Sequence, residues 1–315
     1  MSDRPTILCI VGPTACGKTA LSVALAKRLN GEIVSADAVA VYRRLDIGSA
    51  KPTETERQGI PHHMIDCVDI ADDSFTVSAF RDAARKAIDG IAERGRLPIV
   101  VGGSGLYLDS IFSDMQFSAP SDPEIRAQLE RDYDADKKAV FETLSACDPI
   151  ATKRLHPNDK KRVVRALEVY RVTGKPFSEL NRAFETAQQD DQTYRTARIG
   201  LNPERTVLYA RIDRRVDEMM QNGLLEEAYT LFREGYTPDR YRAMQSIGYA
   251  QLYDAYTGAC SVAEAVERIK LDTRHFAKRQ ITWFKRNPNT VWIDPLAPDF
   301  EDVIRTCMEL INSNE

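Results

Sequence analysis

The sequence has no long hydrophobic run and no export signal. None of its apolar stretches approaches the roughly 18 residues that a membrane-spanning helix requires. Residues 1–6 are polar and lead directly into an apolar stretch, without the basic region, apolar core and cleavage site of a secretory leader. These absences predict a cytoplasmic chain with no membrane partner.

Cysteine and histidine are scarce, and their spacing matches no metal site. The six cysteines are scattered, and the four histidines include one adjacent pair, His62 and His63. Zinc sites need cysteines or histidines at short, regular spacings, which this sequence lacks. We therefore expect no intrinsic transition-metal site, and a cytosolic chain of this size needs no disulfide bonds.

Net charge gives no general attraction to nucleic acid, because 43 basic side chains stand against 47 acidic ones. Basic residues are nevertheless concentrated in the second half. One cluster comprises Lys153, Arg154, Lys160, Lys161, Arg162, Arg165, Arg171 and Lys175, and a second comprises Arg268, Lys270, Arg274, Lys278, Arg279, Lys285 and Arg286. Taken alone, such clusters indicate solvated helix faces.

Strands and helices alternate over the first hundred residues of this 315-residue chain. Apolar runs predict strands at 6–11, 32–36, 63–68 and 98–101, and helical spacing predicts helices at 18–29 and 77–94. This alternation predicts an α/β fold of the phosphate-loop type, in which helices flank a parallel sheet.

The middle of the chain lacks strand signals. From about Ser113 to about Arg195 the sequence is charged, and we expect helices at 122–133, 137–146 and 158–172. We therefore predict a helical insertion domain, 114–194, in a core formed by 1–113 and 195–315. In the second part of the core we expect strands at 197–201, 207–212 and 291–294, and helices at 214–234, 244–256, 262–285 and 300–311.

A phosphate-binding motif lies between the first predicted strand and the first predicted helix. Its residues are Gly12, Pro13, Thr14, Ala15, Cys16, Gly17, Lys18 and Thr19. The glycines let successive backbone amides point into one concavity at a helix N-terminus, where they bind a polyphosphate. We expect Lys18 to contact a phosphate oxygen and Thr19 to hold Mg²⁺.

The motif does not specify which polyphosphate binds, although a nucleoside triphosphate is its usual ligand. The strand at 98–101 runs into Gly102 and Gly103 instead of an acidic residue, and no Asn-Lys-x-Asp guanine motif occurs. These absences disfavour a switch GTPase and a motor ATPase. Asp37 follows the strand at 32–36, so its carboxylate is expected at the same sheet edge, where it binds Mg²⁺, accepts a proton or caps a loop.

A series of short motifs resembles the tRNA dimethylallyltransferases, a family of isopentenyl-group transferases. The motifs are the phosphate loop 12–19 and the segments 35–37, 41–42, 46–52, 60–66, 101–107, 122–126, 162–168, 209–217, 245–249, 273–280 and 283–284. The likeness runs from residue 7 to about residue 293 in the same order. It is therefore far more specific than a phosphate loop alone.

The resemblance implies a reaction. In that family the phosphate loop holds the diphosphate of dimethylallyl diphosphate instead of ATP, in agreement with the missing nucleotide motifs. The implied reaction is displacement of diphosphate by the exocyclic amine N6 of the adenine next to the anticodon, position 37, of tRNA. The base then has to leave the stacked loop and enter a channel, and the prenyl diphosphate enters from the opposite side.

The resemblance also implies roles for individual residues. The implied catalytic residues are Asp37, Thr19, Lys18 and Arg211, of which Asp37 takes the N6 proton and the others, with Mg²⁺ on Thr19 and Asp37, face the diphosphate. For Arg211 an exposed salt bridge is an equal alternative. The implied tRNA contacts are Asp37, Ala38, Val39, Ala40, Ser104, Arg126, Lys161, Arg162, Val163, Val164, Arg165, Gln245, Ser246, Ile247, Gly248, Tyr249 and Ala250.

Three departures from the family pattern bear on these roles. Many relatives have Asp-Ser-x-Gln where this chain has Asp37 followed by Ala38, Val39 and Ala40, so backbone contacts are expected to replace side-chain recognition of adenine. Ser104 replaces a more usual threonine and keeps the hydroxyl group. The sequence contains no Cys/His zinc finger of the eukaryotic kind, which favours a bacterial-type enzyme.

Two other enzymes stay open as alternatives. One is a small-molecule or nucleotide kinase with a helical lid, and the other is an isopentenyltransferase that acts on free adenine nucleotides. The basic insertion and the long C-terminal helices favour tRNA over free nucleotides. The joint presence of Lys18, Thr19, Asp37 and Arg211 disfavours a catalytically silent RNA-binding protein. We see no coiled coil or long apolar edge, so we expect a monomer.

Overall fold

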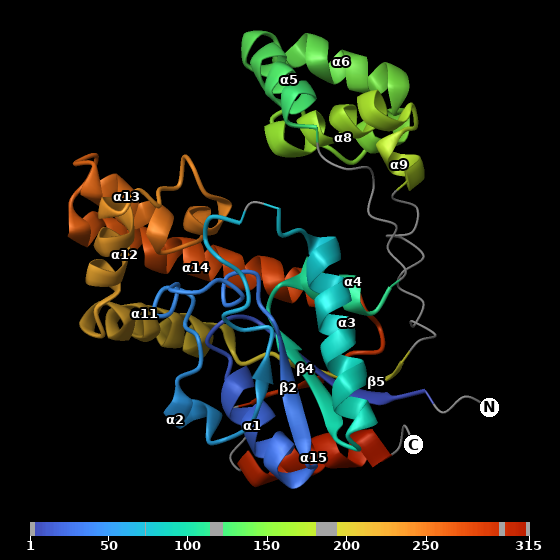
Figure 1. Ribbon diagram of the computed structural model, residues 1–315, viewed down its shortest axis with the longest axis vertical. Coiled ribbons are helices and arrows are strands. Elements are labelled where there is room, and N and C mark those ends of the chain that lie inside the picture. Colours follow the sequence, from blue (N-terminus) through green and yellow to red (C-terminus); the bar gives the residue numbers. More distant parts are fainter. Residues whose placement is uncertain (1–3, 73, 114–121, 181–193, 296–299, 313–315) are drawn as a thin grey trace. The chain divides into compact units, whose positions relative to one another are not determined.

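The structure is a computed structural model that describes residues 4–72, 74–113, 122–180, 194–295 and 300–312 (Figure 1). The chain divides into two compact units. The first unit comprises Met1–Phe112 and Asp191–Glu315, and the second comprises Ser113–Asp190. Of the predicted boundaries of the insertion domain, 114 lies outside the described ranges, and 194 directly precedes a strand that begins at Arg195.

The first unit contains a parallel sheet. Its strands, within the described residues, are β1 (Thr6–Val11), β2 (Gly31–Ala36), β3 (His62–His63), β4 (Leu97–Gly102), β5 (Arg195–Leu201) and β6 (Val291–Ile293). The strand order is β3-β2-β4-β1-β5-β6, and every neighbouring pair is parallel. The predicted α/β class with a parallel sheet is therefore confirmed.

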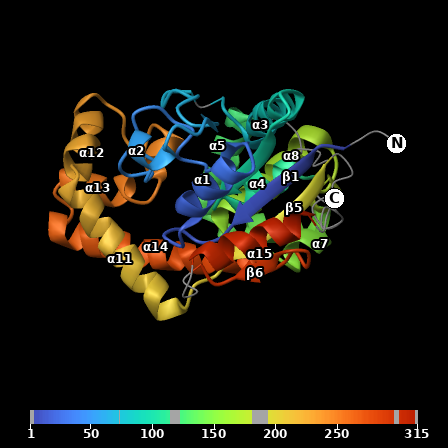
Figure 2. The ribbon, with the colours of Figure 1, turned by 90° about the horizontal axis from the view of Figure 1, so that it is seen from below.

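Helices cover both faces of this sheet because side chains on successive strand residues point to opposite faces. In β1, Ile7 and Cys9 belong to one buried cluster and Leu8 and Ile10 to the other. The first cluster includes residues of α3 (Val77–Glu93) and α4 (Gly105–Ile111), and the second includes residues of α1 (Lys18–Arg28) and α15 (Phe300–Asn312). Figure 2 shows α15 beside α1 and β5, on which it packs.

Further helices complete the first unit. They are α2 (Glu54–Arg57), α11 (Arg205–Gln221), α12 (Leu224–Arg233), the short 3₁₀ helix η1 (Arg242–Gln245), α13 (Tyr249–Tyr256) and α14 (Val262–Phe284). In the described part of the chain, no helix is long and apolar enough to cross a membrane.

The strand predicted at 207–212 is wrong, because these residues belong to helix α11. Glu204 caps the helix by accepting hydrogen bonds from the backbone amides of Thr206 and Val207. Leu208, Ile212 and Val216 are the buried residues of α11, and their spacing of four places them on one helix face. The apolar run was thus one stripe of an amphipathic helix.

Two other predicted elements are shorter than expected. The strand predicted at 63–68 ends after His63, because Met64 and Asp66 have φ values of 62° and 55°, which a strand does not contain. The helix predicted at 244–256 begins only at Tyr249, because Gly248 at φ 104° separates it from η1.

The second unit is entirely helical where it is described. Its helices are α5 (Pro123–Ala135), α6 (Lys137–Cys147), α7 (Pro149–Thr152), α8 (Lys160–Thr173) and α9 (Phe177–Leu180). Leu129, Leu144 and Leu167 lie in its buried cluster. The buried carboxylate of Asp148 caps α7 and accepts two hydrogen bonds from Ser178, which fixes α9.

Candidate active site

The register of the sheet brings three loops to one edge. Gly102, the last residue of β4, pairs with Val11 of β1 and with Ala36 of β2. The loops that follow these strands therefore start side by side, one from Gly12, one from Gly103 and one from Asp37. The carboxyl ends of parallel strands are the usual ligand-binding edge of such a sheet.

The phosphate loop lies between β1 and α1, as the motif predicts. Gly17 forms the N-cap of α1 at φ 99°, a left-handed conformation that suits glycine. The ammonium group of Lys18 donates hydrogen bonds to the carbonyl oxygens of Gly12 (3.0 Å) and Pro13 (2.6 Å). This lysine therefore lies over the loop, where positive charge and a helix N-terminus together favour a polyphosphate.

Asp37 and Ser104 organise the neighbouring turn. Oδ1 of Asp37 accepts hydrogen bonds from the backbone amides of Val39 (2.8 Å) and Ala40 (3.0 Å). Oγ of Ser104 accepts a hydrogen bond from the amide of Ala38 at 3.0 Å. The amides of 38–40 are thus bound within the protein, so the structure does not offer them for the backbone recognition of adenine that we expected. Oδ2 of Asp37 has no hydrogen-bond partner among the described residues.

The structure places Arg215, and not Arg211, against the phosphate loop. Nη1 of Arg215 lies 3.5 Å from Oγ1 of Thr14, and Nη2 lies 3.4 Å from the carbonyl oxygen of Ala50, both long for hydrogen bonds. Burial lowers the pKa of this guanidinium, and the carboxylates of Glu56 and Asp37 oppose that effect. Arg215 has no ion-pair partner among the described residues. Within the same residues, no hydrogen bond joins Arg211 to the phosphate loop.

An unpaired guanidinium at a phosphate loop is a candidate ligand for an anion. The sequence motif contains both arginines, which lie on the same face of the helix and one turn apart. Arg215 directly precedes the buried Val216, whereas Arg211 precedes Ile212 one turn earlier. Which turn of α11 faces the loop depends on the packing of the helix, so the sequence alone did not identify Arg215.

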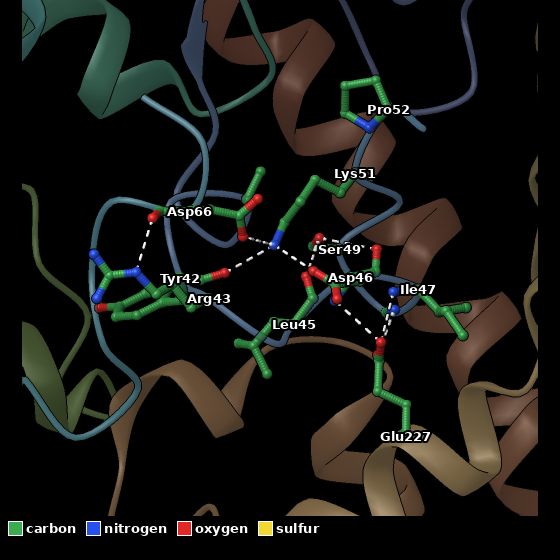
Figure 3. A network of polar contacts seen from close by, with 12 residues as sticks. Tyr42, Arg43, Leu45, Asp46, Ile47, Ser49, Lys51, Pro52, Asp66 and Glu227 are labelled. Carbon is green, nitrogen blue, oxygen red and sulfur yellow. Dashed lines mark hydrogen bonds and ion pairs between the residues drawn. The ribbon is translucent and has the colours of Figure 1, made fainter. Parts of the chain in front are cut away.

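A second polar network fixes the 46–52 segment (Figure 3). This segment supplies the carbonyl group of Ala50, which faces Arg215. The buried ammonium group of Lys51 contacts the carbonyl oxygen of Tyr42 and the carboxylates of Asp46 (2.6 Å) and Asp66 (2.5 Å). The carboxylate of Glu227 accepts hydrogen bonds from the amides of residues 46, 47 and 48. The segment is therefore held from both sides.

The predicted magnesium ligands are suited to the ion by their chemistry. The Thr19 hydroxyl and the Asp37 carboxylate are hard oxygen donors, which Mg²⁺ prefers. In the described part of the chain, no group of three or more His, Cys, Asp or Glu side chains could hold a metal. Magnesium usually shares its coordination between one or two protein groups, substrate phosphates and water, so two donors beside a phosphate loop fit this ion.

Most of the predicted tRNA contacts at 245–250 are partly or fully buried. Gln245 is exposed, but Tyr249 is fully buried and its hydroxyl donates a hydrogen bond to Glu227 at 2.6 Å. Burial raises the pKa of the Tyr249 phenol, which keeps it protonated as a donor. The Tyr249 side chain therefore has a structural role and is not presented to RNA. Of the other predicted contacts, Ser246, Ile247 and Ala250 are half-buried and Gly248 is buried.

The predicted contacts in the second unit fall into three groups. Val163 and Val164 are buried in its hydrophobic cluster, so their side chains are not presented to a ligand. Arg126 and Arg165 both form ion pairs with the fully buried Glu168, which also explains their partial burial. Only Lys161 and Arg162 of this motif are exposed, and Arg162 forms an ion pair with Asp159.

The fold and this sheet edge together define a phosphate-loop α/β protein, in which the loop and the Asp37 carboxylate lie at the same edge of the sheet. Comparison with known proteins narrows the class. The chain matches the IPP transferase family over residues 40–287 and belongs to that family. The resemblance inferred from the sequence motifs is therefore confirmed.

Individual relatives agree with this assignment. A tRNA dimethylallyltransferase of Geobacillus thermodenitrificans (strain NG80-2) is 47% identical over 296 residues, which cover 93% of this chain and 91% of the relative. One of Desulfitobacterium hafniense (strain Y51) is 44% identical over 314 residues, with 96% and 97% covered.

Solved structures share the fold as well. The full-length tRNA isopentenylpyrophosphate transferase from Bacillus halodurans aligns with a TM-score of 0.72 and 38% identity. The alignment covers 99% of this chain and 98% of the Bacillus halodurans chain. A eukaryotic dimethylallyltransferase acting on tRNA aligns with a TM-score of 0.76 and 31% identity, with 93% and 75% covered.

Proposed function

We propose that this chain transfers the dimethylallyl group of dimethylallyl diphosphate to N6 of the adenine next to the anticodon, position 37, of tRNA, and releases diphosphate. The observation that carries this proposal is the register of the sheet, in which the phosphate loop and Asp37 follow the two strands that flank β4, at the same edge. The names of the family and of its relatives supply the substrates.

The leaving group is expected at the phosphate loop. When N6 attacks C1 of the prenyl group, the bond between C1 and the bridging oxygen breaks, and its electron pair stays on the diphosphate. The ammonium group of Lys18 and the guanidinium of Arg215 are the cations at this loop. Stabilising developing charge in a site with fixed donors is commonly the largest catalytic contribution, about 2.7–4 kcal/mol for one donor.

Asp37 is the candidate proton acceptor. Two backbone amides hold its Oδ1, so the carboxylate is oriented before the substrate binds. The N6 proton moves to Oδ2 as the new N6–C1 bond forms. The amine of adenine is a weak nucleophile because it is conjugated with the ring, so alignment of N6 with C1 matters as much as removal of the proton.

Magnesium is expected on Thr19 and Asp37. When bound there, it would neutralise part of the diphosphate charge and so make diphosphate a better leaving group. The hydroxyl of Thr19 would hold it together with phosphate oxygens and water, and the carboxylate of Asp37 would hold it through one of these waters, which leaves Oδ2 able to accept the N6 proton.

The tRNA is expected to present its adenine as an extruded base. The exposed Lys161 and Arg162 of α8 are candidates for contacts with the RNA backbone, which basic side chains recognise. A tRNA substrate implies a cytoplasmic location, and we propose that the chain acts as a monomer.

A radiolabel transfer assay tests this function. Purified protein is incubated with labelled dimethylallyl diphosphate and Mg²⁺ in three separate reactions. One reaction contains unmodified tRNA, one contains AMP and one contains ATP. The proposal predicts label in tRNA alone. Label in the nucleotides would indicate an isopentenyltransferase of free adenine nucleotides, and ATP hydrolysis without transfer would indicate a kinase-like use of the phosphate loop.

A further inference from the structure

Gln280, near the end of α14, is a buried polar side chain that links two loops. It is 5% exposed, and both ends of its amide bind the backbone of other segments. Oε1 accepts a hydrogen bond from the amide of Thr14 in the phosphate loop, at 2.9 Å. Nε2 donates a hydrogen bond to the carbonyl oxygen of Gly103 after β4, also at 2.9 Å.

The turn after β4 is shaped to receive this helix. A Cβ atom on Gly103 would lie 2.3 Å from Nε2 of Gln280, and one on Gly105 would lie 2.4 Å from the ring of Trp283. Residues three apart lie on one side of a helix, so Gln280 and Trp283 approach the turn together. Nε1 of Trp283 also donates a hydrogen bond to Asp109 of α4 at 2.8 Å. The two glycines thus permit a close approach that fixes α14 on the turn.

The same turn supports the candidate proton acceptor. Ser104, the residue after Gly103, accepts a hydrogen bond from the amide of Ala38, which directly follows Asp37. A continuous path of short contacts therefore runs from Thr14 through Gln280 to Gly103 and Ser104, and from there to the Asp37 turn. Its two ends are the proposed leaving-group site and the proposed base.

We propose that Gln280 is a positioning residue, which sets the spacing between the phosphate loop and the Asp37 turn. This inference rests on the proposed function, because the spacing matters only if prenyl transfer occurs between the two. A displacement of about 1 Å between reacting groups costs on the order of 10²-fold in rate. Glutamine suits the position because its amide offers one acceptor and one donor, whereas glutamate offers only acceptors and methionine neither.

Two substitutions separate this role from a purely structural one. In Gln280→Met the side chain keeps its approximate volume and loses both hydrogen bonds, so kcat should fall by about 10²-fold while the KM for tRNA stays unchanged. In Gln280→Glu the bond from Thr14 can persist, but the added negative charge beside the loop should also raise the KM for dimethylallyl diphosphate by about tenfold.

The control is Cys307→Ser in α15, a fully buried residue in the cluster beneath the sheet. It should lower stability and leave kcat per folded molecule unchanged, with the folded fraction taken from urea unfolding. If the wild-type chain transfers label and Gln280→Met matches it per folded molecule, the positioning role is overturned and the proposed function stands. If the wild-type chain transfers no label to tRNA, the proposed function fails and the positioning role fails with it.

Discussion

Arg211 and Arg215 lie four positions apart on α11, and Arg215 is the one that faces the phosphate loop. The two residues have the same side chain and occur in the same motif. They differ in surroundings, because the guanidinium of the half-buried Arg215 lies beside Thr14 and the carbonyl group of Ala50 and has no ion-pair partner in the described residues. A partly desolvated cation without an ion pair favours binding of an anion, so we assign the proposed diphosphate contact to Arg215.

Arg215→Ala should therefore lower kcat for prenyl transfer by about 10²-fold, because one donor to the developing charge is lost. Arg211→Ala should cost less than tenfold. Steady-state rates at saturating tRNA measure both. A larger loss in Arg211→Ala than in Arg215→Ala would return the role to Arg211.

Asp37 combines two tasks that one substitution can separate. Asp37→Asn keeps an oxygen atom for the amides of Val39 and Ala40, so the turn should stay folded. The amide cannot accept the N6 proton, and kcat should fall by about 10²-fold or more. Calorimetry should show that dimethylallyl diphosphate binding is largely retained. Unchanged turnover would remove Asp37 from the proton-transfer step.

The 46–52 segment shows how an element outside the sheet supports the site. Its amides at 46–48 are bound by Glu227, which also accepts the hydrogen bond of Tyr249. Gly48 leaves room for this arrangement, because a Cβ atom there would lie 2.5 Å from the Tyr249 ring. Two motifs distant in sequence are thus joined through one carboxylate.

Glu227→Ala should lower the free energy of unfolding by about 1–3 kcal/mol, since several donors lose their acceptor. The neighbouring Glu226→Ala is the matched control: Glu226 is exposed and pairs with Arg233, so its loss should cost less than about 1 kcal/mol. Urea unfolding of both variants measures the difference. Equal effects would show that the Glu227 network adds no particular stability.

The sequence correctly predicted those strands, loops and helices whose conformation depends on residues close together in the chain. The strand, phosphate loop and helix at 6–28 are set by apolar residues, glycines and the helix start, and all three occur where predicted. The strand prediction at 207–212 was wrong because a short apolar run fits a strand and a helix equally well. The burial of Leu208, Ile212 and Val216 on one face of α11 is what distinguishes the helix from a strand. The bridge made by Gln280 depends on segments 177 and 266 residues away in sequence, which no local pattern contains.

For the whole molecule, the basic clusters prove more neutralised than their sequence indicates. In the first cluster Lys160, Arg162 and Arg165 pair with carboxylates, and in the second cluster Arg268, Lys270 and Arg274 do. The charge that remains available for RNA therefore lies at fewer positions, including the exposed Lys161. The sequence shows how many charged side chains there are, but only the folded structure shows which of them form ion pairs.

Lys161→Glu should raise the KM for tRNA about tenfold at low salt, because a phosphate contact becomes a repulsion. The KM for dimethylallyl diphosphate should not change. Lys138→Glu, on the exposed surface of α6 in the same unit, is the control of equal charge change. Equal effects of the two variants would mean that α8 makes no particular contact with tRNA.

Prenyl transfer to one adenine can be measured by mass spectrometry of the reacted tRNA. Unmodified tRNA is incubated with the wild-type chain, dimethylallyl diphosphate and Mg²⁺, then digested to nucleosides and to fragments of the anticodon loop. We expect one dimethylallyl group on N6 of the adenine at position 37, and none on a tRNA with guanine at that position. A tRNA that gains no group, or gains it at another position, would show that the proposed transfer is wrong.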